Sequence, residues 1–274
     1  MIEIIFPIIV LGSCIGSFLN VVIYRLPKKK PFILNRSHCP FCLRKLNVMD
    51  LFPIISWFFL KGKCRYCSNS ISIRYPFVEL ITSILFALCL VSRGWINNSS
   101  PNVFVMVSGC ILVSYLIILS FIDIDNLILP DSVTYSGSLV GLLLLLYYNF
   151  FINNSIRNLF LNHIYAYIIA LFGCLIFSFI VKLIIKKPGL GGGDAKLFAM
   201  SGAWLGLAGL EVTIVLSFLI SASFVLFGFI FRYVKRGEYI PFGPFICVST
   251  FLVWFFGPHF WIESLGDIFW WKYL

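Results

Sequence analysis

Residues 103–122 read VFVMVSGCILVSYLIILSFI and contain no charged side chain. A helix needs about 20 mostly apolar residues to cross a lipid bilayer, so this run is long enough to do so. Comparable apolar runs occupy residues 2–26, 77–94, 133–152, 159–185, 195–210, 211–233 and 241–262. Hydrophobic residues make up 60% of the chain and charged residues 12%, whereas a soluble domain has about 45–50% and about 25%. The sequence therefore predicts an all-α polytopic membrane protein with about eight transmembrane helices, and it excludes a soluble enzyme or a disordered chain.

The basic residues predict how these helices are oriented. If the first helix starts on the outer side, every Lys and Arg except Arg93, Arg157 and Lys272 falls on the inner side, as the positive-inside rule requires. The net charge of +10 is then a topology signal, and we expect the lipid bilayer rather than a nucleic acid as the partner. The predicted parts are a first transmembrane helix, a cytosolic loop domain and a membrane helical domain, at residues 1–26, 27–76 and 77–274.

The loop at residues 27–76 carries two closely spaced pairs of Cys. Cys39 and Cys42 form one Cys-x2-Cys pair, and Cys64 and Cys67 form a second pair after 21 intervening residues. Two such pairs at this spacing are typical of a zinc site with four thiolate ligands. The site is predicted to be structural, because four protein ligands leave no open position for water. A redox pair or an iron centre remains the alternative.

Two acids stand at the edges of apolar runs. Asp123 closes the run quoted above, and Asp194 opens the run at 195–210. Placing a carboxylate in or beside a membrane span costs free energy, because the charge loses its water. An acid at such a position is therefore a candidate functional residue. We expect both acids at the cytosolic rim of the membrane. Two carboxyl groups from separate helices could act there as in an aspartic protease, with one ionised as the general base and the other protonated as the general acid. Gly191 and Gly193 precede Asp194 and would let a peptide backbone approach the acid closely, which makes them candidate substrate-binding residues.

Structural roles for these acids also stay open. Asp194 could simply cap the helix that follows it, and Asp131 fits the cap of the helix after it even better, because Asp is a favoured N-cap residue. Asp125 lies two positions from Asp123, so on a continuing helix it faces elsewhere, and we expect it to be solvated.

Several further motifs resemble those of the type IV prepilin leader peptidases, many of which are also N-methyltransferases. An N-terminal signature and two stretches around the Cys pairs carry much of this resemblance, together with two short motifs between and after them. These motifs are GSFLNVVIYRLP (16–27), RSHCPFC (36–42), KGKCRYC (61–67), DLFPIIS (50–56) and RYPFVEL (74–80).

The resemblance implies that Asp123 and Asp194 are the catalytic acids and that Gly191 and Gly193 belong to the family's Gly-x-Gly-Asp motif. It implies a membrane aspartic endopeptidase of the bacterial inner (cytoplasmic) membrane, with the zinc loop and the catalytic acids on the cytosolic side. The expected partners are type IV prepilin or pseudopilin precursors of pilus or type II secretion systems. The enzyme would cut their short basic leader at the cytosolic membrane face.

The resemblance further implies that the new N-terminus is methylated by S-adenosylmethionine. Asp50 and Glu79 are candidate contacts for this methyl donor, with a solvated loop acid and a helix-start acid as the alternatives. Many family members have an acidic residue where this chain has Pro188, so any contribution of that acid is missing here.

Two other classes of protein compete with this interpretation. A transporter or channel would use carboxylates to bind or relay cations. Such a protein would have acids near the middle of the membrane and an internal repeat, whereas these acids are expected at one rim and the sequence has no convincing repeat. A membrane scaffold organised by zinc would explain the four Cys but not the Gly191–Asp194 motif.

Overall fold

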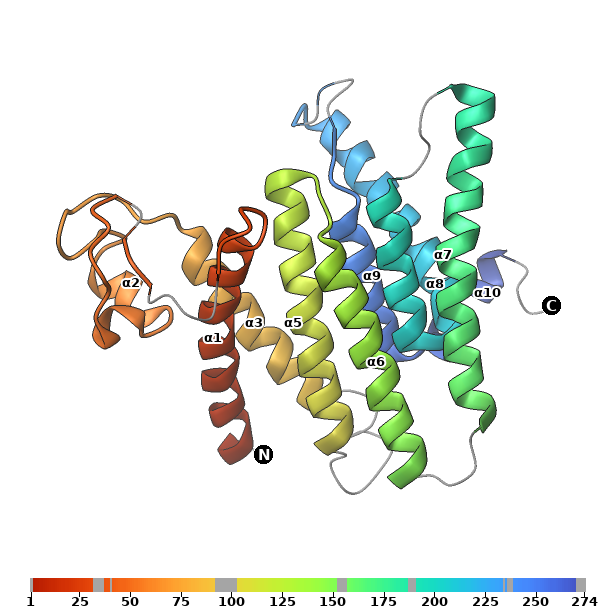
Figure 1. Ribbon diagram of the computed structural model, residues 1–274, viewed down its shortest axis with the longest axis horizontal. Coiled ribbons are helices and arrows are strands. Elements are labelled where there is room, and N and C mark those ends of the chain that lie inside the picture. The colour runs from red at the N-terminus through yellow and green to blue at the C-terminus, as the bar shows by residue number, and fades with distance from the viewer. Residues whose placement is uncertain are drawn as a thin grey trace. The chain divides into compact units, whose positions relative to one another are not determined.

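The computed structural model describes residues 2–31, 37–39, 41–91, 103–151, 157–186, 191–233, 235 and 239–269. Across these ranges every regular element is a helix, accompanied only by two isolated β-bridges. The helices are α1 (Ile2–Arg25), η1 (Val48–Leu51), α2 (Ile55–Phe59), α3 (Arg74–Leu90), α5 (Val103–Asn126), α6 (Asp131–Phe151), α7 (Arg157–Ile185), α8 (Gly192–Ile230), α9 (Gly243–Phe256) and α10 (Pro258–Phe269) (Figure 1). The all-α prediction is therefore confirmed.

The chain forms two compact units, Met1–Ile118 and Leu119–Leu274. In the first unit α1 and α3 pack closely, and small residues make this possible. A Cβ atom at Gly12 would lie 2.8 Å from the Cα of Ser83, and one at Gly16 would lie 2.8 Å from the Cα of Glu79. Small residues at helix interfaces let two membrane helices approach in this way.

In the second unit α8 turns back on itself at Gly206, where the backbone has a φ of +70°. The ring of Phe242, just before α9, lies 6.2 Å from the ring of Phe198 and 5.2 Å from that of Phe218. A straight helix would place these two contacts about 30 Å apart, so the two halves of α8 run in opposite directions. They correspond to the predicted spans at 195–210 and 211–233, with the break four residues earlier than the sequence indicated.

The predicted span at 241–262 is wrong as a single helix. It is divided into α9 and α10, which meet at 98° around Gly257. Gly257 has a φ of +81°, and Pro258 follows it. A proline disfavours helical geometry in the residue before it, so the chain bends there.

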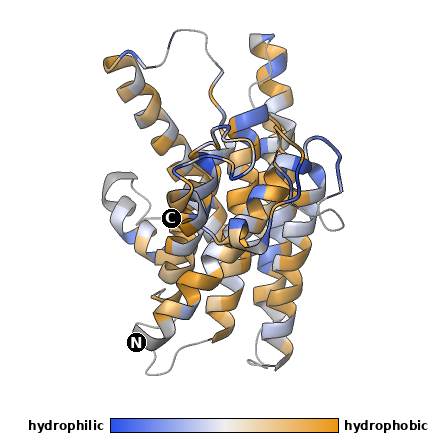
Figure 2. Ribbon diagram, turned by 90° about the vertical axis from the view of Figure 1, so that its left-hand side faces the viewer, coloured by the Kyte–Doolittle hydropathy of each residue, from blue (hydrophilic) through white to orange (hydrophobic). Residues whose placement is uncertain are grey.

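Four described helices are long and apolar enough to cross a membrane, or five spans if the bent pair α9 and α10 counts as one. The four are Ile5–Arg25, Val103–Asn126, Leu159–Ile184 and Gly192–Ile230. Hydrophobic residues predominate along the helices, whereas the hydrophilic stretches lie mostly in loops (Figure 2). On α7, for example, Phe172, Ile176, Phe179 and Leu183 are all exposed. The count of eight transmembrane helices and the three-part division of the chain stay predictions.

Candidate functional site

Asp123 lies in the last turn of α5 with only 5% of its surface exposed. Its Oδ2 accepts a hydrogen bond of 2.9 Å from the backbone N–H of Gly243 at the start of α9. A Cβ atom at Gly243 would stand 2.7 Å from the same oxygen, so a larger residue at this position would displace the carboxylate. The positive end of a helix dipole also favours a carboxylate at this place.

Asp194 lies in the first turn of α8, and its Oδ2 accepts a hydrogen bond of 3.3 Å from the backbone N–H of Gly191. The helix begins at Gly192, so Asp194 is its third residue and reaches back to the residue before the helix, as in half of a capping box. The capping interpretation therefore holds in part, but with Gly191 rather than Asp194 as the N-cap. Pro188 lies outside the residues that the structure describes.

A cavity of about 420 Å³ is open to both carboxylates. Three segments form its walls: the end of α5 with the loop after it, the loop that begins α8, and the segment before α9. The lining residues are Asp123, Leu127, Ile128, Leu129, Asp131, Gly191, Gly192, Gly193, Asp194, Ile240, Pro241 and Phe242. Asp123 and Asp194 are close enough to interact electrostatically. The fold thus brings together the four residues predicted for catalysis and substrate binding, from positions far apart in the chain.

The two motif glycines have packing roles of their own. A Cβ atom at Gly193 would lie 3.0 Å from the Cβ of Leu129, in the opposite wall, and one at Gly191 would lie 2.9 Å from Oδ2 of Asp194. At Gly192 between them, a Cβ atom would meet nothing within 4 Å. The spacing of the glycines therefore matches the two tight contacts, and their predicted role in binding substrate stays a prediction.

Asp131 is the first residue of α6, and its carboxylate accepts a hydrogen bond of 2.6 Å from Nζ of Lys196. The ammonium group of Lys196 also lies 5.5 Å from the centre of the Tyr135 ring. This ion pair joins the start of α6 to the start of α8 beside the cavity. Asp131 was predicted only to cap α6, and neither this ion pair nor the role of Gly243 was predicted. Asp125 is exposed, as expected.

The four predicted zinc ligands lie together in the first unit. The Sγ atoms of Cys39, Cys42, Cys64 and Cys67 are all within 4.8 Å of one another. The two Cys pairs have the same local backbone. The N–H of Cys39 bonds to the carbonyl of Arg44, and the N–H of Cys64 bonds to the carbonyl of Asn69. Leu43 and Ser68, at matching positions, have φ values of +56° and +57°. Such a cluster could hold a metal ion.

The surroundings of the thiols favour binding of a cation. The backbone N–H groups of Cys67 and Tyr66 point at the sulfur of Cys64 and lower the pKa of this thiol to about 7. At Cys67 the N–H of Asn69 acts in the same direction, but burial and the neighbouring thiols of Cys64, Cys42 and Cys39 raise the pKa to about 11. Four thiolates this close repel one another, so a divalent cation stabilises the fully deprotonated set.

Comparisons with known proteins found relatives over most of the chain. The model of a bacterial peptidase A24 N-terminal domain matches residues 10–93, and that of the type IV leader peptidase family matches residues 110–231. A prepilin leader peptidase/N-methyltransferase of Neisseria gonorrhoeae is 35% identical over 268 residues, which cover 89% of this chain and 87% of that protein. Proteins of the same name from Aeromonas salmonicida (strain A449) and Xanthomonas campestris pv. campestris are 31% and 33% identical, over 89% and 90% of this chain and 87% and 89% of theirs. No solved structure matches the chain.

Proposed function

We propose a function for this chain from the premise that it belongs to the type IV leader peptidase family. It is a multi-pass protein of the inner membrane that removes the leader of prepilin-like precursors and then methylates the new N-terminus. The curated relatives carry both activities in their name. None of the relatives described above is named as a transporter or a channel.

The observation that carries the peptidase assignment is the shared cavity of Asp123 and Asp194. In the proposed reaction an ionised carboxylate accepts a proton from water while the water oxygen attacks the scissile carbonyl carbon. The second carboxyl group, which is protonated, gives its proton to the carbonyl oxygen. The C–N bond of the tetrahedral intermediate then breaks, and the leaving amine takes up from the first carboxyl group the proton that came from water. As the carbonyl re-forms, one hydroxyl of the intermediate returns its proton to the second carboxylate, which restores the starting state of both acids. Two carboxylates in one partly buried cavity supply both proton-transfer groups.

The backbone around the two acids supports this role. Gly243 holds one oxygen of Asp123, and Gly191 holds one oxygen of Asp194. Neither donor is a side chain, so neither can rotate away from its acid. Fixed orientation of catalytic groups accounts for a large part of enzymatic rate enhancement, because a small displacement is costly.

The four thiols of the loop fit zinc as the resident metal. A set of four Cys ligands is a closed tetrahedral site, so the metal would stabilise the loop and take no part in hydrolysis. Only two described loop residues, Cys39 and Cys64, combine apolar character with full burial, so metal binding supplies much of the folding free energy.

S-adenosylmethionine is the proposed methyl donor, on the strength of family membership. The two acids that the sequence offered as contacts are already engaged inside the first unit. Asp50 forms an ion pair of 2.7 Å with Arg65, and Glu79 accepts the N–H of Ile54 at 2.7 Å. We therefore assign the methyl donor to neither of them.

The distribution of basic residues supports a cytosolic location for the loop and for both acids. A precursor with a basic leader obeys the same rule, so its leader would stay on the same side of the membrane. The scissile bond would then lie at the depth of the cavity.

Incubating the purified full chain with a prepilin, with and without S-adenosylmethionine, tests the proposal. Mass spectrometry should show loss of the leader in both reactions and an added methyl group only with the donor. An intact precursor would rule out the peptidase, and a cleaved but unmethylated product would rule out the second activity.

A further inference from the structure

The segment Leu51–Leu60, between the two Cys pairs, carries an apolar face that the described residues of the loop leave exposed. The exposed fractions of these side chains range from 40% to 83%. The members of this apolar face are Leu51, Phe52, Ile55, Phe58 and Phe59. An exposed patch of this kind marks a site of contact with another protein or with a membrane.

The position of this segment along the length of α1 indicates that the apolar face contacts a membrane and not another protein. The N–H of Ile54 bonds to Oε2 of Glu79 on α3, and Glu79 lies directly against Gly16 of α1. Gly16 stands nine residues before the end of α1 at Arg25, which corresponds to about 13 Å along the helix. The Glu79 side chain leans back toward the start of α3. Ile54 therefore lies a few ångströms closer than Gly16 to the level of Arg25 at the end of α1. The helix α2 accordingly lies level with the body of α1 rather than beyond its end (Figure 1).

Several polar groups of this segment are hydrogen-bonded within the protein, as a lipid environment requires. Polar groups at membrane depth must bond within the protein, because hydrocarbon offers them no partner. The N–H groups of Ser56, Phe58 and Leu60 bond to the carbonyls of Phe52, Ile54 and Ser56. The indole N–H of Trp57 bonds to the carbonyl of Ile71 at 3.1 Å. The segment thus turns apolar side chains outward and keeps these polar groups inward.

We propose that the apolar face inserts into the headgroup boundary of an anionic phospholipid bilayer, in the leaflet at the Arg25 end of α1. Amphipathic segments at an interface bury their apolar side chains about 5–10 Å deep, which agrees with the depth of Ile54. Lys61 and Lys63 follow the segment and are exposed, so they can reach lipid phosphates. The loop would then be attached to the membrane at its middle as well as at its two ends.

Photocrosslinking in the full chain tests this proposal. A benzophenone amino acid replaces Phe59, which is 83% exposed, and the protein is reconstituted in nanodiscs of equal parts phosphatidylcholine and phosphatidylglycerol. The same substitution at Phe41, which is 60% exposed on the first Cys pair, is the matched control. Both positions are exposed aromatics, so neither substitution disturbs a core. Zinc content and elution volume verify that each variant is folded.

After illumination, mass spectrometry should find lipid adducts at position 59 in yields about tenfold above those at position 41. Equal yields at the two positions would overturn the proposal, because exposure alone would then explain lipid contact. Absence of adducts at position 59 in a folded variant would overturn it as well. Neither outcome depends on peptidase activity.

Discussion

The backbone N–H of Gly243 donates a hydrogen bond of 2.9 Å to Oδ2 of Asp123, although 120 residues separate the two in the sequence. This contact joins the start of α9 to the end of α5. It also brings Ile240, Pro241 and Phe242 to the wall of the cavity that holds both acids. One of the two proposed catalytic groups is therefore held by backbone from a different helix.

Replacing Gly243 with alanine should cut the rate of precursor cleavage by a factor on the order of 100. The new Cβ atom would stand 2.7 Å from the Asp123 carboxylate and would displace it from its position in the cavity. Single-turnover cleavage by the purified variant, followed by mass spectrometry, measures the loss.

Gly173→Ala is the matched control, because a Cβ atom at Gly173 on α7 would meet nothing within 4 Å. Its cleavage rate should stay within about twofold of the wild type, since an exposed helix position tolerates alanine. Wild-type activity in Gly243→Ala would show that the hydrogen bond to Asp123 has no part in catalysis.

The reversal of α8 makes a prediction about stability. Gly206 has φ +70° and ψ −174°, a conformation that is essentially restricted to glycine. A Cβ atom there would also lie 2.9 Å from Nδ2 of Asn162. Gly206→Ala should therefore lower the free energy of unfolding by about 1–3 kcal/mol or more.

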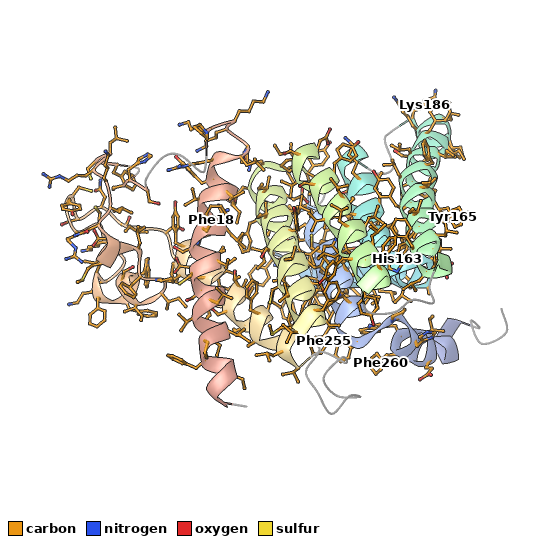
Figure 3. All side chains as sticks on the ribbon, turned by 60° about the horizontal axis from the view of Figure 1, so that its bottom comes forward. Phe18, His163, Tyr165, Lys186, Phe255 and Phe260 are labelled. Carbon is orange, nitrogen blue, oxygen red and sulfur yellow. The ribbon has the colours of Figure 1, made fainter. Side chains whose placement is uncertain are left out.

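Thermal unfolding in one detergent, compared with Gly173→Ala, measures this difference. Buried His163 contributes to the same turn, because its Nδ1 lies 3.0 Å from the carbonyl oxygen of Ala203. His163 points into the helix bundle, whereas Tyr165 on the same helix points away from it (Figure 3). An unchanged melting temperature for Gly206→Ala would mean that the reversal does not depend on glycine.

The four-thiol cluster predicts about one zinc ion per purified chain. Cys64→Ser should lose the metal and make the loop sensitive to proteases, because the proposed metal would supply much of the folding free energy of the loop. Cys14→Ser, at an exposed position on α1, should keep the metal. Elemental analysis by mass spectrometry measures the zinc content, and full zinc occupancy in Cys64→Ser would contradict the assignment.

The ion pair between Asp131 and Lys196 should matter much less than the two proposed catalytic acids. The side chain of Asp131 is 60% exposed and that of Lys196 is 24% exposed, and exposed pairs contribute about 0–1 kcal/mol. Asp131→Asn should thus lower the cleavage rate by less than about tenfold. Complete loss of activity in this variant would give Asp131 a direct part in the reaction.

Local patterns in the sequence predicted the parts of the site that depend on residue type and spacing. The two Cys pairs lie in short loops whose geometry repeats, so their spacing was sufficient to predict a cluster. Asp123 and Asp194 were expected at one depth because each stands at the edge of an apolar run. The fold brings both to one cavity.

Other features could not be predicted in this way. A backbone donor such as the N–H of Gly243 has no signature of its own, although glycine between Pro241 and Pro244 does indicate a turn. The reversal at Gly206 was placed too late because apolar residues continue through it without a polar break. The bend at Gly257 was overlooked even though Pro258 is the local signal for it.

The most direct measurement is precursor cleavage by Asp123→Asn and Asp194→Asn, each compared with Asp125→Asn at the neighbouring exposed position. All three variants should insert at wild-type levels and keep their zinc. Mass spectrometry of a prepilin incubated with each should show an intact leader for the first two and normal processing for the third. Wild-type cleavage by either Asp123→Asn or Asp194→Asn would contradict the proposal that these two carboxylates carry out the hydrolysis.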